Sequence, residues 1–259
     1  MAHAGKDKQL SGNTPRSGTL NPELVLRAYA MGVFPMADAH DAPDVYWVEP
    51  PRRAILPLDG FRLSRSLAKT IRQNRFRITA DVAFEQVIAL CAASAGDRPE
   101  TWINAAIRDV FVELHALGFA HSIEVWDDDR LVGALYGLSL GRAFFGESMV
   151  SRARDASKVA LANLVARLRV GGFSLLDCQF MTGHLQSLGA IEVPRGDYIA
   201  LLGTALGASS AGLAAGAPVV EGDWRALDAL GVALPPPPAG TVSGPVGGKL
   251  IVQLLTQAS

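Results

Sequence analysis

A strict alternation of residues over the stretch 173–180 predicts a β-strand. One face of this strand would carry Phe173, Leu175, Asp177 and Gln179, and the other would carry Ser174, Leu176, Cys178 and Phe180. Asp177 and Gln179 are therefore two positions apart in an otherwise apolar strand. Burying their polar groups is unfavourable unless these groups are hydrogen-bonded. We expect this pair to contact each other, the backbone or a ligand.

A carboxylate also ends the apolar strand pattern that comes earlier in the chain. The stretch 143–147 reads as a strand in which Glu147 follows two phenylalanines, and the stretch 156–169 then reads as an amphipathic helix. Glu147, Asp177 and Gln179 could form a structural network between the sheet and this helix. The alternative is a polar site at the centre of the sheet that holds an amine-bearing substrate, and the succession of these elements favours it.

The remaining pattern predicts an α+β fold. From Phe76 to Val193 the elements read β-α-α-β-β-β-α-β-α-β, which indicates a mixed sheet with helices on both faces. A helix that begins at Asn21 and two short strands, Val45–Val48 and Arg53–Pro57, predict a small N-terminal α/β domain. We expect a disordered lead-in over 1–18, this small domain over 19–57, the main domain over 58–205, and a low-complexity tail over 206–259. Two short amphipathic pieces of the tail, Trp224–Leu230 and Leu250–Gln257, are expected to dock on the main domain.

Charge is unevenly distributed although the formal net charge is only −1. No acidic residue lies between Asp59 and Asp81, whereas this interval contains Arg62, Arg65, Lys69, Arg72, Arg75 and Arg77. Three of them share one face of a predicted helix over 64–74. This basic segment is either a solvated helix face or a surface that binds a polyphosphate chain, such as RNA.

Cysteine and histidine usage gives no sign of zinc or of a disulfide framework. The two cysteines form no CxxC pair, which favours a reducing, cytoplasmic compartment, and no histidines have metal-ligand spacing. Met1–Gly18 lacks the apolar segment of a signal peptide. The interval Tyr198–Val220 carries no charge, but its glycines, serines and Pro218 favour a short helix and a linker over a membrane span.

Four further features of the sequence bear on its chemistry. Gly137–Gly141 matches G-x-S-x-G, but strand patterns on both sides favour a hairpin over a nucleophile elbow. His184 begins a short predicted helix without an obvious acidic partner, which favours a capping or surface role. Trp102 could be a core residue or a platform for base stacking. No glycine-rich loop precedes the helix over 156–169, which argues against a small nucleotide cofactor.

Ten blocks, taken in order, give the chain its resemblance to the leucyl/phenylalanyl-tRNA–protein transferases over roughly Leu24–Leu202. They are A28-Y-x-x-G-x-F-P35, Trp47–Arg53, S64-R-S66, T101-W-I103, H121-S-I-E-V-W126, L131-V-G-x-x-Y-G137, G146-E-S-M149, A156-S-K158, D177-C-Q179 and S187-L-G-A190. The resemblance implies a small N-terminal domain and a main domain with the acetyltransferase-like (GNAT) fold. It implies transfer of Leu, Phe or possibly Met from aminoacyl-tRNA to the α-amino group of proteins that begin with Arg or Lys, which marks them for N-end-rule degradation. No metal or coenzyme A is implied.

The resemblance also implies roles for individual residues. These are Glu147, Asp177 and Gln179 as catalytic residues, Tyr29 and Trp102 as the residues that hold the terminal adenosine, and Leu135, Phe144, Leu164 and Leu176 as the amino-acid pocket. Many relatives have Trp where this chain has Met36, and several pocket positions here are Leu. Phe144 and Glu147 fall on opposite faces of an ideal strand, so a shared pocket requires a bulge or a splayed strand end.

We expect Gln179 to orient the attacking amine, Asp177 to fix the Gln179 amide or to accept a proton through a relay, and Glu147 to pair with the substrate ammonium group. The tRNA 3′ end would approach along the basic segment. Two other functions fit the same residues. An N-acetyltransferase would bind acetyl-CoA, and a non-catalytic tRNA-binding module would bind tRNA without transferring its amino acid.

Overall fold

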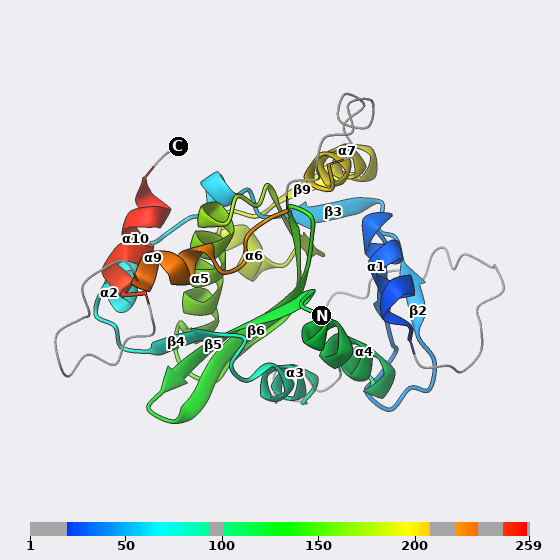
Figure 1. Cartoon of the computed structure of the whole chain (residues 1–259), viewed down its shortest axis with the longest axis horizontal. Coiled ribbons are helices and arrows are strands. Elements are labelled where there is room, and N and C mark those ends of the chain that lie inside the picture. The colour runs from blue at the N-terminus through cyan, green and yellow to red at the C-terminus, as the bar shows by residue number, and fades with distance from the viewer. Residues whose placement is uncertain (1–19, 94–100, 208–220, 233–245, 258–259) are drawn as a thin grey trace.

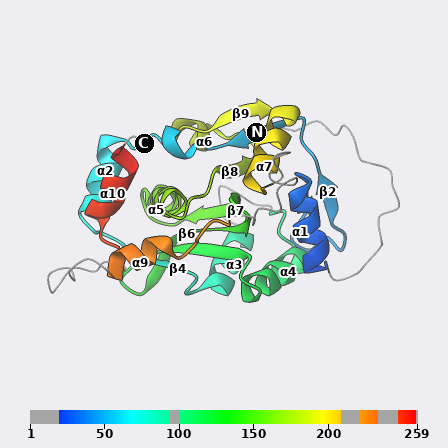
Figure 2. The ribbon, with the colours of Figure 1, turned by 45° about the horizontal axis from the view of Figure 1, so that its top comes forward.

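The computed structural model describes residues 20–93, 101–207, 221–232 and 246–257. Within these residues, helices cover both faces of a seven-stranded sheet (Figures 1 and 2). In spatial order the strands are β4 (Arg77–Ala80), β5 (Ala120–Asp127), β6 (Arg130–Leu140), β7 (Ala143–Ser151), β8 (Leu175–Gln179), β3 (Arg52–Ile55) and β9 (Ile191–Pro194). Only the β7–β8 pair is parallel among these neighbours. The prediction of an α+β fold with a mixed sheet is confirmed.

Each face of the sheet has its own apolar core. One core contains side chains of α2 (Arg65–Arg72), α5 (Ala156–Val170) and α6 (Gly183–Ser187). The other contains side chains of α1 (Pro22–Ala30), α3 (Phe84–Ala92), α4 (Ala105–Ala116) and α7 (Arg195–Ala205). The observed α5 matches the helix predicted over 156–169 to within one residue. Because α5 is almost entirely buried, it forms the centre of the first core.

The N-terminal segment contributes to two sheets. Asn21 caps α1 by accepting a hydrogen bond from the Glu23 backbone N–H at 2.8 Å. Two short strands, β1 (Phe34–Met36) and β2 (Tyr46–Val48), then pair antiparallel. The strand expected over Arg53–Pro57 is β3, which is inserted between β8 and β9 of the main sheet. This insertion brings the N-terminal part of the chain into direct contact with the strand that carries Asp177.

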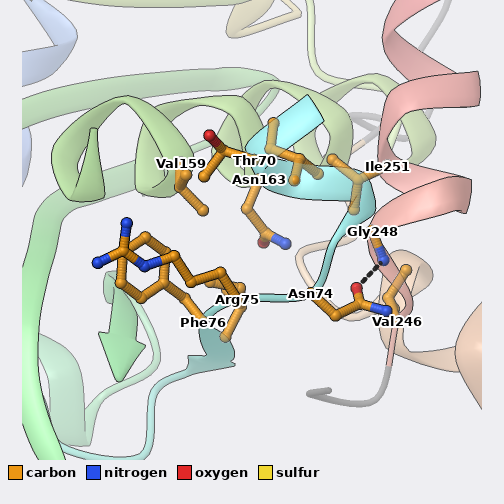
Figure 3. A pocket seen from close by; sticks show the side chains of 11 residues that line it. Thr70, Asn74, Arg75, Phe76, Val159, Asn163, Val246, Gly248 and Ile251 are labelled. Carbon is orange, nitrogen blue, oxygen red and sulfur yellow. Dashed lines mark hydrogen bonds between the residues drawn. The ribbon is translucent and has the colours of Figure 1, made fainter. Parts of the chain in front are cut away.

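Two C-terminal segments pack on the α5 side of the sheet. Residues 221–232 include α9 (Ala226–Val232), and Trp224 before it stacks on His121 and on Phe144 at centroid distances of 4.3 and 5.4 Å. The second segment forms α10 (Gly248–Thr256), which lies beside α2 and α5 in both views (Figures 1 and 2). Figure 3 shows the small cavity at this junction, where the Gly248 backbone N–H donates to Asn74 Oδ1 at 2.7 Å. A Cβ at Gly248 would lie 1.8 Å from the Ile71 carbonyl oxygen, so α10 approaches α2 backbone to backbone.

Two motifs noted in the sequence have clear positions in this fold. Ser139 of the G-x-S-x-G motif lies inside β6, and Gly141 forms the β6–β7 turn with φ of 56°. The hairpin interpretation is therefore confirmed. The uncharged interval that begins at Tyr198 forms α7 as far as Ala205, and residues 208–220 lie outside the described part. Over the described residues, every helix is too short or too polar to traverse a bilayer.

Candidate active site

A cavity of about 580 Å³ opens where β7 and β8 separate. Their parallel pairing ends at Phe145 and Asp177, and the next residues of both strands line the cavity. Its walls come from β1, the segment before α4, β6, β7, α5, β8 and α6. The residues that line it include Met36, Trp102, Leu135, Glu147, Leu164, Leu176, Gln179 and His184. A volume of this size suits a small-molecule or cofactor-sized group.

A β-bulge brings Glu147 into this cavity. In the β6–β7 ladder Tyr136 pairs with Ser148 and Gly137 pairs with Gly146, so Glu147 is the extra residue on β7. The bulge changes the alternation of side chains after Phe144, so that Glu147 lines the cavity and Phe144 does not. Glu147 is 8% exposed, and its Oε1 accepts a hydrogen bond from Gln179 Nε2 at 2.8 Å.

Asp177 lies behind the cavity wall, fully buried, and its carboxylate is held by three neighbours. The Arg53 guanidinium donates from Nε and Nη2 at 2.7–3.0 Å, and the Tyr198 hydroxyl donates to Oδ2 at 2.9 Å. The third donor is the backbone N–H of Gln179, 2.8 Å from Oδ1. Asp177 thus contacts the backbone of Gln179, whereas the expectation was a contact with the Gln179 side-chain amide.

Gln179 leaves the regular strand conformation at this point. Its φ is 55°, which is uncommon for a residue other than glycine. In a regular strand, Gln179 would lie on the same face as Asp177. Its side chain instead lines the cavity together with Leu176 and Cys178, which belong to the opposite face of the strand. The hydrogen bond from its backbone N–H to Asp177 holds this left-handed conformation in place. Asp177 is therefore a positioning residue for the Gln179 side chain.

Arg53 is the site residue that the sequence analysis missed. It is 1% exposed and lies between the Phe34 and Tyr198 rings, at 4.5 and 4.6 Å from their centroids. Its Nη1 also donates to the Gly32 carbonyl oxygen at 3.0 Å. Burial alone would lower the pKa of Arg53, but the charge and hydrogen bonds of the Asp177 carboxylate, with Tyr198 and Tyr29, together outweigh burial and raise this pKa. A charged residue in the apolar strand pattern of Arg53–Pro57 was the available signal.

Burial raises the pKa of Glu147 to about 8. The Asp177 charge raises it further, while the Tyr29 hydroxyl, the Arg53 charge and the Gln179 amide oppose the shift. Glu147 Oε2 and the Tyr29 hydroxyl are both buried, and neither has a partner at full hydrogen-bond distance among the described residues. The Tyr29 hydroxyl is nevertheless close enough to Glu147 to lower its pKa. Because burial dominates, Glu147 is protonated at neutral pH.

The other predicted pocket residues are divided between the wall and the core behind it. Leu135, Leu164, Leu176 and Trp102 line the cavity, together with Met36. Phe144 does not line it, because its ring stacks on Trp224 with an interplanar angle of 8°. Tyr29 is also fully buried, between Phe111 and Phe145. The structure thus brings Glu147, Gln179 and the leucines together around one cavity and places Tyr29, Phe144 and Asp177 behind its walls.

Comparison with known proteins gives matches along most of the chain. The family model described as leucyl/phenylalanyl-tRNA protein transferase matches residues 55–203, and the model of its N-terminal domain matches residues 18–51. The chain belongs to the leucyl/phenylalanyl-tRNA protein transferase family. The resemblance inferred from the ten sequence blocks is confirmed.

Three relatives carry the name leucyl/phenylalanyl-tRNA–protein transferase. One from Rhizorhabdus wittichii is 62% identical over 245 residues, which are 93% of this chain and 99% of the relative. One from Zymomonas mobilis is 57% identical over 82% of this chain and 76% of its own. One from Novosphingobium aromaticivorans is 55% identical over 92% of this chain and 96% of its own. Sequence identity to two of these relatives therefore covers nearly the whole length of this chain and of theirs.

The basic segment of this transferase family member surrounds α2. Leu67, Ala68 and Ile71 of the helix are buried, and Arg65, Lys69 and Arg72 are exposed on its other face. Arg62 and Arg75 are also exposed, whereas Arg77 is half-buried over the Trp126 ring at 4.9 Å. None of these six cations is within ion-pair distance of an acidic residue in the part of the chain that the structure describes.

The raised pKa of Glu147 predicts how stability depends on pH. Between about pH 4.5 and 8 the folded state holds a proton that the unfolded state has lost, so stability falls as pH rises, by at most about 1.4 kcal/mol per pH unit. Glu147→Gln should remove this decline, since the amide does not titrate. Urea unfolding of both proteins across this range measures the difference. The exposed Glu113→Gln serves as the control and should follow the wild type; equal slopes for wild type and Glu147→Gln would contradict the prediction.

Proposed function

We propose that the protein transfers Leu or Phe, and possibly Met, from aminoacyl-tRNA to the α-amino group of proteins that begin with Arg or Lys. This reaction marks the acceptor for N-end-rule degradation. The observation that carries the proposal is identity of 55–62% to relatives with this name over nearly the whole chain. The cavity supports it, because an apolar wall lies beside a polar Gln179–Glu147 pair. Such a recess suits an amino acid with an apolar side chain and a charged amino group.

In the proposed mechanism the amino-acid side chain of the donor lies against Leu135, Leu164 and Leu176. The ammonium group of the donor pairs with the Glu147 carboxylate, which ionises when a cation approaches because opposite charge stabilises it. The incoming amine nitrogen attacks the ester carbonyl, the C–N bond forms, and the C–O bond to the ribose breaks. Aminolysis of an ester is favourable, so positioning supplies much of the rate enhancement.

The polar residues divide this work. The Gln179 amide orients the reacting groups, and it is held by Glu147 through its side chain and by Asp177 through its backbone. Trp102 stacks on the terminal adenosine, with Met36 beside it in place of the Trp of many relatives. Tyr29 and Phe144 support the site from behind, since neither lines the cavity. The reaction needs no metal or cofactor.

The tRNA body approaches over α2, whose cations Arg65, Lys69 and Arg72 are exposed to solvent. Three exposed charges at helical spacing suit the regular phosphates of a nucleic-acid backbone. The proposal also includes an acetyltransferase-like (GNAT) main domain and a cytoplasmic location, where aminoacyl-tRNA occurs. The mixed sheet in which β7 and β8 separate supports this fold assignment.

Incubation with radiolabelled Leu- or Phe-tRNA and a peptide that begins with Arg tests the proposal. We expect label in the peptide, and none in a matched peptide that begins with an acetylated Arg, because its α-amine cannot attack. Binding of the tRNA without any transfer would instead indicate a tRNA-binding module. Binding of acetyl-CoA with acetylation of the peptide would indicate an N-acetyltransferase.

A further inference from the structure

An exposed aromatic ring lies in the cavity wall beside the polar pair, and the mechanism above gives it no role. Phe180 lines the cavity and is 45% exposed. It directly follows Gln179, the last residue of β8, so the two Cα atoms are about 3.8 Å apart. Gln179 in turn donates to Glu147, which lines the same cavity. A side chain attached to a group held at Gln179 can therefore reach the Phe180 ring.

β1 separates Phe180 from the other accessible aromatic side chain of the wall, Trp102. Phe34, at the start of β1, contacts Phe180 with ring centroids 5.7 Å apart and planes at 77°. Ala37, directly after β1, donates its N–H to the Trp102 carbonyl oxygen at 3.2 Å. Both rings line the cavity, so aromatic surface is available at each end of this strand. Trp102 holds the terminal adenosine in the proposed function, which leaves Phe180 for another part of the reactants.

The acceptor brings a second cation into the site, because its first residue is Arg or Lys in the proposed function. Among the described residues that line the cavity, Glu147 is the acidic one, and it pairs with the ammonium group of the donor. Asp177 lies behind the wall and is paired with Arg53. Asp38 is exposed two positions after β1 and does not line the cavity. An aromatic face is the other kind of protein group that attracts a cation.

We propose that Phe180 receives the cationic side chain of the acceptor's first residue through a cation–π contact, and this inference rests on the proposed function. The α-amine of that residue lies at Gln179, and its side chain extends over the Phe180 ring. The site already contains such a contact, since the Arg53 guanidinium lies 4.5 Å from the Phe34 ring centroid. A ring attracts both an ammonium and a guanidinium group, whereas a carboxylate that binds bidentately favours Arg. Phe180 is thus a specificity-determining residue that accepts Arg and Lys alike.

Two peptides that differ only in their first residue, Arg or citrulline, test this role. Citrulline has the shape of Arg but carries no charge. Wild type should prefer the Arg peptide, and Phe180→Leu, which keeps an apolar side chain without a ring, should lower the ratio of the two kcat/KM values about tenfold. Phe180→Trp should keep or raise the ratio, because indole is the strongest cation–π partner. The kcat/KM for the citrulline peptide should stay within about twofold in both variants, which shows that they are folded and active.

Three results would overturn the inference. Equal losses with both peptides in Phe180→Leu would indicate a packing role. A weaker affinity for Phe-tRNA in filter binding, with the Arg-to-citrulline ratio unchanged, would indicate that the ring stacks on a nucleobase. Loss of the ratio in Asp38→Asn but not in Phe180→Leu would assign the cation to the acidic loop after β1. Failure of the wild type to transfer to either peptide would instead reject the proposed function itself.

Discussion

Replacing Arg53 with methionine is expected to lower the free energy of unfolding by about 3–5 kcal/mol, because it leaves a buried carboxylate without its cation. Asp177 has no exposed surface and would retain only two hydrogen bonds, from Tyr198 and from the Gln179 backbone. The guanidinium also supports the Phe34 and Tyr198 rings, which adds to the loss. Urea denaturation followed by circular dichroism measures the change.

Two companion variants make this result specific to the ion pair. The neighbouring Arg52 is 55% exposed, and its ion pair with Glu192 is long, with 3.4 Å between Nε and Oε2. Because exposed ion pairs contribute little, Arg52→Met should change the free energy of unfolding by no more than about 0.5 kcal/mol. The double variant Arg53→Met, Asp177→Asn removes both charges and should be more stable than Arg53→Met alone. If it is equally unstable, the loss comes from packing and the ion pair carries little of the stability.

The same variants bear on the chemistry through Gln179. Asp177 accepts from the Gln179 backbone while this residue holds a φ of 55°. We expect the left-handed turn to be held less firmly when Asp177 loses its cation, which would free the Gln179 amide from Glu147. Under the proposed function, this pair of residues behind the cavity wall would thereby determine the geometry of the group that faces the substrate.

The sequence predicted what depends on local periodicity. Alternation identified the strand with Asp177 and Gln179, and the unfavourable burial of these residues marked the site. The expected bulge or splayed end of β7 is present, although Phe144, whose shared pocket with Glu147 was the reason for expecting it, lies outside the cavity. These inferences succeeded because each depends on neighbours a few residues apart.

Three features escaped prediction because they depend on contacts distant in sequence. Arg53 meets Asp177 across 124 positions, and nothing local connects them. Gln179 takes a left-handed conformation in which the Asp177 side chain accepts its N–H, so regular alternation placed its side chain on the wrong face. Phe144 is turned from the pocket to the core by its stacking on Trp224, which lies in the C-terminal segment outside the matched family region.

Replacing Arg65, Lys69 and Arg72 together with glutamine is expected to weaken binding of aminoacyl-tRNA about 100-fold or more at moderate salt. These side chains are exposed on one face of α2 and form no ion pair among the described residues, so they are available to phosphates. Glutamine is a good helix former, and the buried face of α2 against α5 and α10 is unchanged. Filter binding at several salt concentrations measures the affinity.

Two measurements distinguish the loss of phosphate contacts from damage to the fold: the salt dependence of tRNA affinity, and transfer from a small aminoacyl donor. Each lost phosphate contact reduces the slope of log affinity against log salt by about one, so the triple variant should lose about three. Transfer from a short aminoacylated CCA fragment should stay close to wild type, because this donor occupies the cavity and does not extend over α2.

A control variant replaces three exposed cations on other surfaces, Arg27, Arg108 and Arg130, with glutamine. It has the same net charge as the α2 variant and should retain the wild-type slope. Equal losses of affinity in both triple variants would show that only net charge matters, and α2 would then not be the tRNA-binding face.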